Sequence, residues 1–435
     1  MKDERLEKLA DVLVNYSTKV KKGDRVAISA EDAALPFIKA VARAAVKAGA
    51  LVEYYIDVPD VDAELLKNGT EEQYARENIR FGACAKSDVW ISAWGSENTK
   101  TMQSIEAERL KQKRLANKDN RKIYSERMGT GELRWCGTQF PTNGDAQNAG
   151  MSLEEYEDFV YTAGYLYEED PVAKWQEMAA WQEKWASYLD GKKELHILSK
   201  DTDIFVNVAG RKWINCCGDA NFPDGEIFTS PVEDGINGYI TFSYPAIMNG
   251  NEFYEVRLTV EKGRIVDVSC KNEEMLDTLL SYVDTDAGSR YFGEVAIGTN
   301  YGIQRHTKNI LFDEKIGGSM HMAIGEAFRE AGGIPVSDPA EIYKACDVIL
   351  QILPTHPIIR NSVEQAIQYG KPGNVIVDLS STAPDIILEL YQQAKDAGMF
   401  LLDSPVSGGN PMAIAGTLAI MTGGDKEAFD KVKPV

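Results

Sequence analysis

Three residues in the middle of the chain have the side-chain chemistry of a metal site. They are Glu226 in NFPDGEIFTSP, Glu294 in YFGEVAIGTN and His321 in SMHMAIG. Two carboxylates and an imidazole on separate elements suit a hard-to-borderline divalent cation such as Zn, Co or Mn. Their spacing in the sequence is not diagnostic of a metal site. A glutamate at a strand end is more often a solvated charge, and a histidine is more often simply hydrogen-bonded. The residue types alone leave both interpretations open.

Strands are the elements that must position these residues. Between about 194 and 305, β-branched residues alternate with polar ones in LHILSKDTDIFVNVAG, GYITFSY, EFYEVRLTVEKGRIVDVSC and GEVAIGTNYG. Such alternation is typical of half-buried strands, and EKGR indicates a hairpin turn. We therefore predict a mainly β domain over residues 191–330, with Glu226 on a glycine-containing turn between strands and Glu294 at the start of a strand.

The first 190 residues predict an α/β and helical domain. The runs RVAISA, LVEYYID and DVWISAW are short and β-rich, and LPFIKAVARAAVKAGA between the first two has helical apolar spacing. Strands that alternate with helices favour a layered domain with a parallel sheet.

Two amphipathic helices are predicted from 152 to 190, with a break at Asp170 and Pro171. Ser152 and Glu155 have the spacing of a capping box at the start of the first helix. The second helix carries aromatic residues that suit either a binding box or core packing, and we favour core packing. These residues are Trp175, Trp181 and Trp185.

The pattern returns to α/β after about residue 331. DVILQILP, NVIVDLSS and FLLDSPVSG read as buried parallel strands, and IIRNSVEQAIQYG and PDIILELYQQAKDAG between them read as helices. We predict an incomplete Rossmann-type α/β segment over residues 331–435, which follows the β domain without a Pro/Ser-rich spacer.

The composition excludes some classes of partner. The chain has 435 residues, of which 44% are hydrophobic and 26% charged, enough for cores in two or three domains. Its net charge of -20 repels phosphate backbones and anionic lipid, so we expect neither nucleic acid nor membrane as a partner. The charged start MKDERLEKLADVL, the lack of an 18-residue apolar run and six cysteines without metal-ligand spacing indicate a cytoplasmic protein.

Four segments carry a resemblance to a known family. They are LADVLVNYSTKVKKGDRVAI, LRWCGTQFPTNGDAQNAGMSLEEYEDF, GRKWINCCGDANFPDGEIFTSPVEDGINGYITF and GTNYGIQRHTKNILFDEKIGGSMHMAIGEAF. Through them residues 1 to about 330 resemble the thermophilic aminopeptidases, the aminopeptidase T-like metallopeptidases. The resemblance implies a two-domain, dimeric peptidase that acts on peptides with two adjacent divalent ions.

The same resemblance assigns roles to the three residues. By position, Glu226, Glu294 and His321 match three of the family's metal ligands, and either glutamate could bridge the ions or act as the catalytic base. The chain departs from the family at Phe328, where a tyrosine is expected, and after residue 330, where a His-x-Asp pair should complete the metal cage. His356 lies in Thr-His-Pro and does not restore that pair. We therefore expect a metallo-aminopeptidase whose activity is weakened or lost.

Residues 331–435 resemble a second family. DPAEIYKACDVILQILPTHP, GKPGNVIVDLSSTAP and FLLDSPVSGGNPMAIAGTLAIMTGGDKEAFDKV follow the 3-hydroxyisobutyrate dehydrogenase group, which includes tartronate semialdehyde reductases. The resemblance implies that Ser407, Gly408 and Gly409 bind substrate and that Leu353 and Pro354 contact NAD(P). For the two glycines, a simple turn after a strand is the alternative.

This second segment lacks the glycine-rich turn that binds pyrophosphate, since GxGxxG occurs nowhere in the chain. We expect NAD(P) not to bind.

Two alternatives to a peptidase remain, namely a dehydrogenase fragment and an inactive chimera that only folds and dimerises. The segment EAGG fits both families where they meet, which is consistent with a joining of two genes, and sequencing one DNA molecule across codons 320 to 345 tests this hypothesis.

Overall fold

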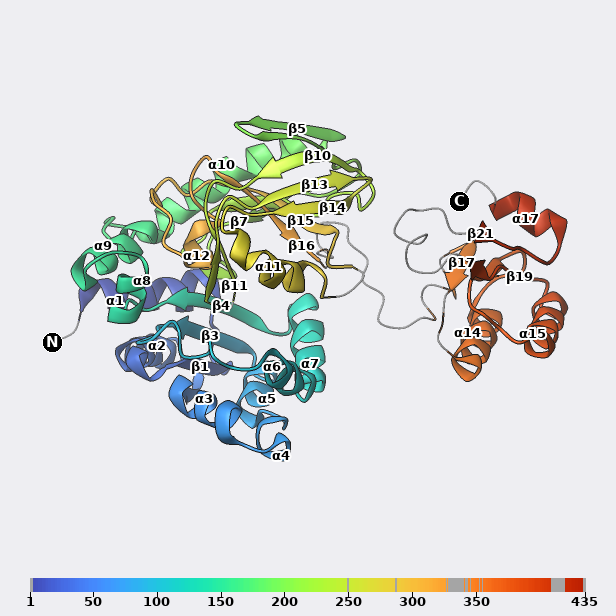
Figure 1. The fold of residues 1–435 in the computed structure, drawn as a ribbon. Coiled ribbons are helices and arrows are strands. Elements are labelled where there is room, and N and C mark those ends of the chain that lie inside the picture. Colours follow the sequence, from blue (N-terminus) through green and yellow to red (C-terminus); the bar gives the residue numbers. More distant parts are fainter. Residues whose placement is uncertain are drawn as a thin grey trace. The chain divides into compact units, whose positions relative to one another are not determined.

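The computed structural model describes residues 3–248, 250–285, 288–325, 327, 340, 343–344, 346–351, 353, 355–407 and 419–432 (Figure 1). The chain divides into two compact units, Met1–Ile334 and Pro335–Val435, and each is described by itself. Within the described residues, no helix combines the length and the apolar composition that crossing a membrane requires. The three predicted domain ranges, 1–190, 191–330 and 331–435, stay predictions.

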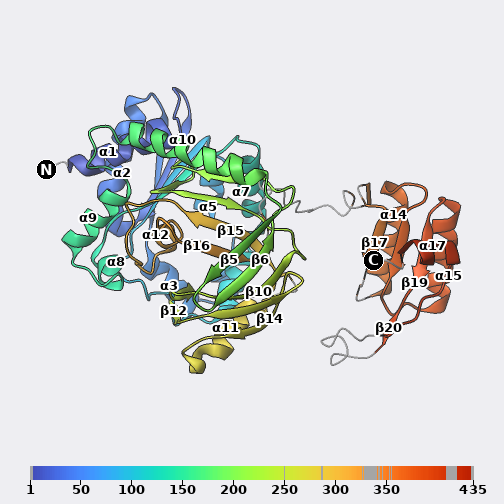
Figure 2. The ribbon, with the colours of Figure 1, turned by 90° about the horizontal axis from the view of Figure 1, so that it is seen from above.

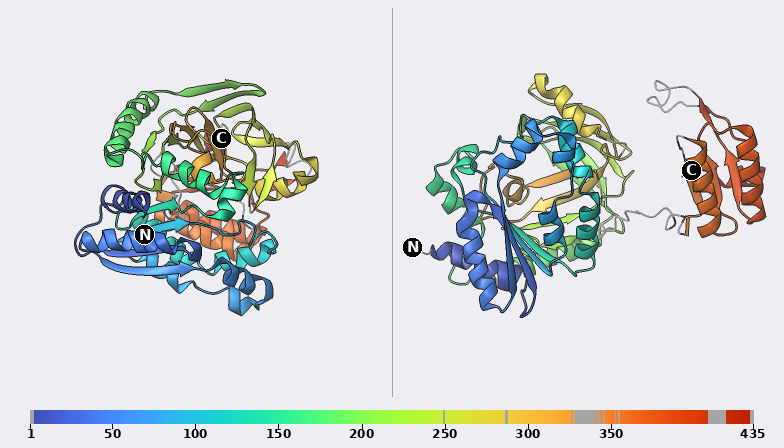
Figure 3. Two further views of the ribbon diagram at one scale, coloured as in Figure 1. Left: turned by 90° about the vertical axis from the view of Figure 1, so that its left-hand side faces the viewer. Right: turned by 90° about the horizontal axis from the view of Figure 1, so that it is seen from below.

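A parallel sheet forms the base of the first unit, as the alternation of strands and helices predicts. Its strand order is β2-β1-β3-β4-β8, with each neighbouring pair parallel. Figure 3 shows its blue and teal strands side by side. The strands are β1 (Arg25–Glu31), β2 (Leu51–Asp57), β3 (Val89–Trp94), β4 (Arg134–Gln139) and β8 (Asn221–Phe222).

One face of this sheet packs into an apolar core. Val26, Ile28 and Ile91 are fully buried on this face, in a core shared with α1 and α2. Helices of the first half of the unit are α1 (Glu4–Asp11), which runs on into η1 (Val12–Ser17), η2 (Asp32–Ala34), α2 (Leu35–Lys47), α3 (Pro59–Asn68), α4 (Glu71–Tyr74), α5 (Ile79–Ala85), α6 (Ala107–Leu115), α7 (Lys118–Gly129) and α8 (Asn143–Asn148).

The predicted helix pair is present as α9 (Leu153–Ala163) and α10 (Pro171–Asp190). Ser152 and Glu155 form the predicted capping box, and Asp170 caps α10. The prediction that all three tryptophans pack in a core is wrong for two of them. Trp175 is completely buried, but Trp181 and Trp185 are 40% and 48% exposed, because they lie outside the buried face of α10, which Trp175, Met178, Gln182, Ala186 and Leu189 form.

Two antiparallel sheets form the predicted β region. The first has the order β14-β13-β10-β6-β5, and the predicted EKGR turn joins β13 to β14 through Lys262 and Gly263, both with positive φ. Its strands, with the small hairpin β11–β12 and the nearby helices, are β5 (Glu194–Ser199), β6 (Thr202–Asn207), β10 (Ile236–Thr241), β11 (Ala246–Met248), β12 (Asn251–Phe253), β13 (Arg257–Glu261), β14 (Arg264–Ser269), η3 (Glu273–Met275) and α11 (Leu276–Val283).

The second antiparallel sheet has the order β16-β15-β9-β7. Figure 2 shows β15 and β16 side by side. This sheet and the antiparallel sheet described above share one apolar core. Its elements are β7 (Ile214–Cys216), β9 (Glu226–Thr229), β15 (Phe292–Gly298), α12 (Ile310–Asp313) and β16 (Met320–Ile324).

The second unit contains the predicted parallel strands, in the order β17-β18-β19, with a helix after each of the first two. α14 and α15 pack against this sheet around Val363 and Leu390, which are completely buried. The elements are β17 (Val348–Gln351), α14 (His356–Tyr369), β18 (Val375–Asp378), α15 (Pro384–Asp396), β19 (Phe400–Asp403), β20 (Val406–Ser407), β21 (Ala419–Ile420) and α17 (Lys426–Val432).

Candidate metal centre

The β16-β15-β9-β7 sheet carries all three predicted metal ligands on one face. Glu226 begins β9 and lies opposite Gly298, and His321 lies opposite Ala296 on the other side of β15. Glu294 precedes Ala296 by two positions on β15. Directly opposed residues and residues two apart project from the same side of a sheet, so the three side chains converge.

The distances confirm that the three side chains meet. The Nε2 atom of His321 lies 3.3 Å from Oε1 of Glu294 and 3.5 Å from Oε2 of Glu226. One ligand atom from each residue lies within 4.8 Å of the other two. Both carboxylates are buried, with Glu226 only 6% and Glu294 only 9% exposed. The sequence prediction of Glu294 at the start of a strand is off by two residues, because β15 begins at Phe292.

The backbone carbonyl of Glu314 fixes the imidazole. It lies 3.0 Å from Nδ1 of His321, and a carbonyl can only accept, so Nδ1 donates its proton there. In the neutral ring the lone pair of Nε2 then faces two carboxylates. Such an arrangement requires a cation between them, which is either a proton on Nε2 or a metal ion. Burial lowers the pKa of His321, but the hydrogen bond to Glu294 and the charges of Glu226 and Glu314 outweigh it, so the pKa is raised.

Lys315 is a charged residue of this site that the sequence reasoning missed. It is 1% exposed, and its Nζ lies 3.2 Å from Oε1 of Glu226 and 3.4 Å from Oε2 of Glu314. Burial alone would lower the pKa of Lys315, but the carboxylates of Glu226, Asp224 and Glu314 raise it overall. The available signal was the pair Glu-Lys within FDEKIGG, a charged dipeptide between apolar residues close before His321.

Asp224 completes the buried charge cluster. It is 1% exposed, and its carboxylate accepts hydrogen bonds from the backbone N–H groups of Gly218 and Gly225 at 3.1 and 3.0 Å. Burial raises the pKa of Asp224 to about 7, against the opposing effect of Lys315. Cys216, Asp224 and Glu226 also bring ligand atoms within 4.8 Å of one another. The ammonium of Lys315 occupies the same surroundings, so we assign this second group to charge balance.

Small residues let the loop before β16 approach the site. A Cβ at Gly298 would collide with the carbonyl oxygen of Ile316 and lie 2.9 Å from Oγ of Ser319. Asn300 anchors the turn that follows β15, because its Nδ2 donates to the carbonyls of Ala163 and Asp224 at 3.0 and 2.8 Å. The backbone that presents Lys315 and His321 is therefore held against β15 and against α9.

The donor set fits a divalent metal ion. Oε2 of Glu226 is buried and has no hydrogen-bond partner in the structure, which is unfavourable unless a cation binds there. Its neighbours are a second carboxylate oxygen and an imidazole nitrogen whose other nitrogen is already hydrogen-bonded. Carboxylate oxygen and imidazole nitrogen are usual zinc ligands, and the carbonyl on Nδ1 is the usual outer partner of a metal-bound histidine.

The second unit brings part of its predicted site together. Leu353 lines a cavity of about 500 Å³ with His356, Ser380 and Val406, and its N–H donates to Oγ of Ser380 at 2.8 Å. Ser407 follows Val406 and is exposed at the end of β20. Four predicted positions lie outside the described residues, namely Phe328, Pro354, Gly408 and Gly409.

Comparisons with known proteins match the chain to two families. The family Thermophilic metalloprotease (M29) matches residues 2–345, and the NAD binding domain of 6-phosphogluconate dehydrogenase matches residues 320–435. A 2-(hydroxymethyl)glutarate dehydrogenase of Eubacterium barkeri is 38% identical over 98 residues, 22% of this chain and 33% of that protein. The C-terminal segment thus spans about a third of this dehydrogenase relative.

The larger match covers most of the chain. Aminopeptidase AmpS of Bacillus subtilis is 26% identical over 359 residues, which is 75% of this chain and 85% of that protein. The solved structure of wild-type AmpT from Thermus thermophilus superposes with a TM-score of 0.65 at 25% identity, over 76% of this chain and 89% of that one. The chain therefore belongs to the thermophilic metalloprotease family (M29).

Proposed function

We propose that the chain is a metal-dependent aminopeptidase that releases N-terminal residues from peptides. The observation that carries this proposal is the convergence of Glu226, Glu294 and His321 on one point, with Oε2 of Glu226 left without a hydrogen-bond partner. The named aminopeptidases among the relatives support the same reaction class. Zn, Co or Mn suits these ligands, and one or two ions fit the proposal.

In this proposal Glu226, Glu294 and His321 hold the ion. A bound divalent ion supplies a water of lowered pKa and polarises the peptide carbonyl. The ammonium of Lys315 contacts Oε1 of Glu226 at 3.2 Å and leaves Oε2 to face the ion, and the Glu314 carbonyl keeps Nε2 of His321 free to bind. Among the described residues, no lysine or arginine forms an ion pair with Glu294, so we assign the movement of a proton during catalysis to the carboxylate of Glu294.

The test combines metal analysis with hydrolysis of aminoacyl anilides. Purified full-length protein should bind Zn, Co or Mn and lose its hydrolysis when a chelator removes the metal. The variant Glu294→Gln should reduce hydrolysis more than the matched exposed variant Glu261→Gln, which lies at a hairpin end. Protein that neither binds metal nor cleaves any anilide would contradict the proposal.

The cavity beside Leu353 supports nucleotide binding as a second candidate function. We propose that this chain nevertheless does not bind NAD(P), because the glycine-rich turn that holds the pyrophosphate is missing from the sequence. Titration with NADH and NADPH, followed by tryptophan fluorescence, tests this directly. Saturable quenching would overturn the proposal and support an oxidoreductase.

We further propose a cytoplasmic homodimer. An exposed aromatic row on α10 supports an interface, since Trp181, Trp185 and Tyr188 are 40%, 48% and 57% exposed and their rings contact one another. Light scattering of the purified protein measures its mass. The variant Trp185→Lys should shift a dimer towards monomer, and an unchanged monomeric mass in both proteins would contradict this interface.

A further inference from the structure

A cavity of about 550 Å³ lies on the parallel sheet, away from the metal centre residues, and none of its lining residues belongs to that centre. Its floor comes from one face of the sheet. Ser29 and Glu31 on β1 share this face with Asp57 on β2 and with Trp90 on β3, as the strand register requires. A parallel sheet is normally covered by apolar contacts on both faces, so polar and aromatic floor residues are unusual. The volume is that of a small-molecule site.

The position of the cavity matches where α/β sheets bind ligands. Glu31 ends β1 and Asp57 ends β2, so the acidic side chains lie at the carboxyl ends of the strands. In the order β2-β1-β3-β4, β2 lies on one side of β1, and β3 and β4 follow on the other side, so the chain changes sides between β1 and β3. Trp94 ends β3, on the far side of this point from Asp57. Ligands of open parallel sheets bind outside the carboxyl ends at such a point.

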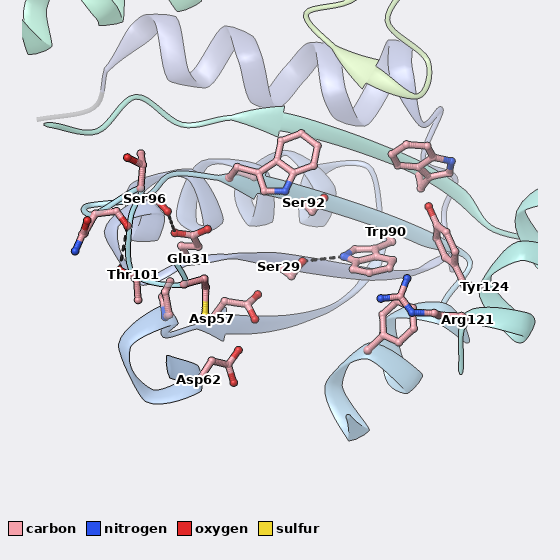
Figure 4. A pocket seen from close by; sticks show the side chains of 18 residues that line it. Ser29, Glu31, Asp57, Asp62, Trp90, Ser92, Ser96, Thr101, Arg121 and Tyr124 are labelled. Atoms are coloured by element: carbon pink, nitrogen blue, oxygen red, sulfur yellow. Dashed lines mark hydrogen bonds between the residues drawn. The ribbon is translucent and has the colours of Figure 1, made fainter. Parts of the chain in front are cut away.

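The two ends of the cavity differ in chemistry (Figure 4). Glu31, Asp57 and Asp62 lie at one end, and Trp90, Tyr124 and Arg121 lie at the other. Trp90 is fixed there, because its Nε1 donates to Oγ of Ser29 at 2.8 Å and its ring lies 5.7 Å from that of Tyr124. The acidic end suits a cation, and the aromatic end suits a flat apolar body.

Charge pairing leaves Glu31 as the one acidic residue of the three that the described residues do not neutralise. Asp57 pairs with Arg80, and Asp62 lies 3.3 Å from Nζ of Lys113. Glu31 accepts a hydrogen bond from Oγ of Ser96 at 2.8 Å but forms no ion pair within the described part of the chain. Burial raises the pKa of Glu31, and the nearby charges of Asp145 and Asp57 raise it further. A bound cation would relieve this repulsion.

The opposite end carries a cation of its own. The guanidinium of Arg121 lies over the ring of Phe81, 5.9 Å from the ring centroid, and forms no ion pair with the described acidic residues. Its charge repels an ammonium group from the aromatic end and thereby directs it towards Glu31. Trp90 lies opposite Ala27, four residues before Glu31 on β1, so the backbone positions of the two ends are about 13 Å apart. An ion pair at Glu31, a ring contact at Trp90 and a short ligand between them bridge this distance.

We propose that this cavity is a binding site for an organic cation, with a primary ammonium at Glu31 and an aromatic body against Trp90. This site is separate from the metal centre and goes beyond the proposed peptidase function. A ligand of this class has its positive charge about one ethylene group away from its ring.

Calorimetry with the full-length protein and 2-phenylethylammonium chloride tests the proposal. The protein is first treated with a chelator, so that binding is independent of metal and of peptidase activity. We expect saturable binding at one site. The neutral analogue 2-phenylethanol and the aliphatic n-butylammonium should each bind at least tenfold more weakly. Equal binding of 2-phenylethanol would overturn the proposal. Tighter binding of L-phenylalanine would also overturn it, because a zwitterion would then be the preferred class, through Arg121.

Variants locate the binding site. Glu31→Gln should weaken 2-phenylethylammonium binding at least tenfold, whereas Asp32→Asn, an exposed neighbour with the same loss of charge, should change it less than twofold. Glu294→Gln should leave it unchanged. Loss of binding in Glu294→Gln with retention in Glu31→Gln would place the amine at the metal centre and overturn the proposal. Circular dichroism of each variant checks the fold, and the ligand series on the unaltered protein decides independently if Glu31→Gln does not fold.

Discussion

The ammonium of Lys315 lies 3.2 Å from Oε1 of Glu226, with both side chains almost entirely withdrawn from solvent. A buried ion pair gives little net stability compared with apolar residues, but removal of one partner leaves an uncompensated charge. Lys315 therefore balances the charge of Glu226 in the candidate metal centre when that centre holds no ion. A bound divalent cation would take over part of this role, because it also compensates Glu226.

Lys315→Met should lower the free energy of unfolding of the metal-free protein by about 3–5 kcal/mol, since Glu226 loses its buried counterion. The matched control is Lys174→Met, which breaks the exposed pair to Glu177 at 2.8 Å and should cost less than about 1 kcal/mol. Urea unfolding measures both. Zinc or cobalt should restore part of the loss in Lys315→Met. Equal losses in the two variants would show that the buried pair does not balance Glu226.

His321→Gln should weaken binding of Zn or Co at least about tenfold, because even removal of an outer partner of a metal ligand commonly costs that much. Equilibrium dialysis with elemental analysis measures the affinity. His196→Gln is the control, since His196 also contacts a carboxylate, Asp203 at 2.9 Å, but at the surface of another sheet. Unchanged metal affinity in His321→Gln would remove His321 from the ligand set.

The sequence singles out the three candidate metal ligands but not the strands that bring them together. It places Glu226 on a turn and Glu294 at the start of a strand, whereas Glu226 begins β9, Glu294 lies inside β15 and His321 lies on β16. Lys315 was missed, because a buried lysine is uncommon and only the fold shows that its neighbours are carboxylates. Strand β8 could not be predicted to join the N-terminal sheet, since Asn221 and Phe222 are too short a run to show a pattern.

The two exposed tryptophans illustrate a second limit. The spacing of Trp181 and Trp185 is that of a helix face, but the pattern does not tell which face meets the core. The same holds for the cavity on the parallel sheet. Alternation in VWISAW indicates a strand, and only the register with β1 and β2 brings Trp90 and Glu31 onto one floor.

Gly298→Ala should disturb the metal centre without removal of a ligand. The added Cβ would collide with the carbonyl of Ile316, which must then move together with Lys315 and the start of β16. We expect a loss of about 1–3 kcal/mol in the free energy of unfolding, as for overpacked cores, and weaker metal binding. Gly129→Ala is the control, because nothing lies within 4 Å of its added Cβ. Metal affinity that is unchanged in Gly298→Ala would contradict this account of the loop.

The pKa of Glu31 predicts a pH dependence of stability. Burial raises this pKa above its ordinary value, so the folded protein holds the proton more tightly than the unfolded chain does. The free energy of unfolding contributed by Glu31 is therefore present below the ordinary glutamate pKa and falls as the pH rises through the raised one. Glu31→Gln removes the charge and should stabilise the protein at pH 7 but not at pH 4.

Urea unfolding of the unaltered protein and the variant at both pH values measures this difference. Asp32→Asn is the control for net charge, and it should stabilise the protein at pH 7 less than Glu31→Gln does, because Asp32 is exposed. Saturation with 2-phenylethylammonium should reverse the order at pH 7, since the ligand stabilises only a folded protein that keeps the Glu31 charge. A variant that is less stable than the unaltered protein at pH 7 without ligand would show that the Glu31 charge is already compensated.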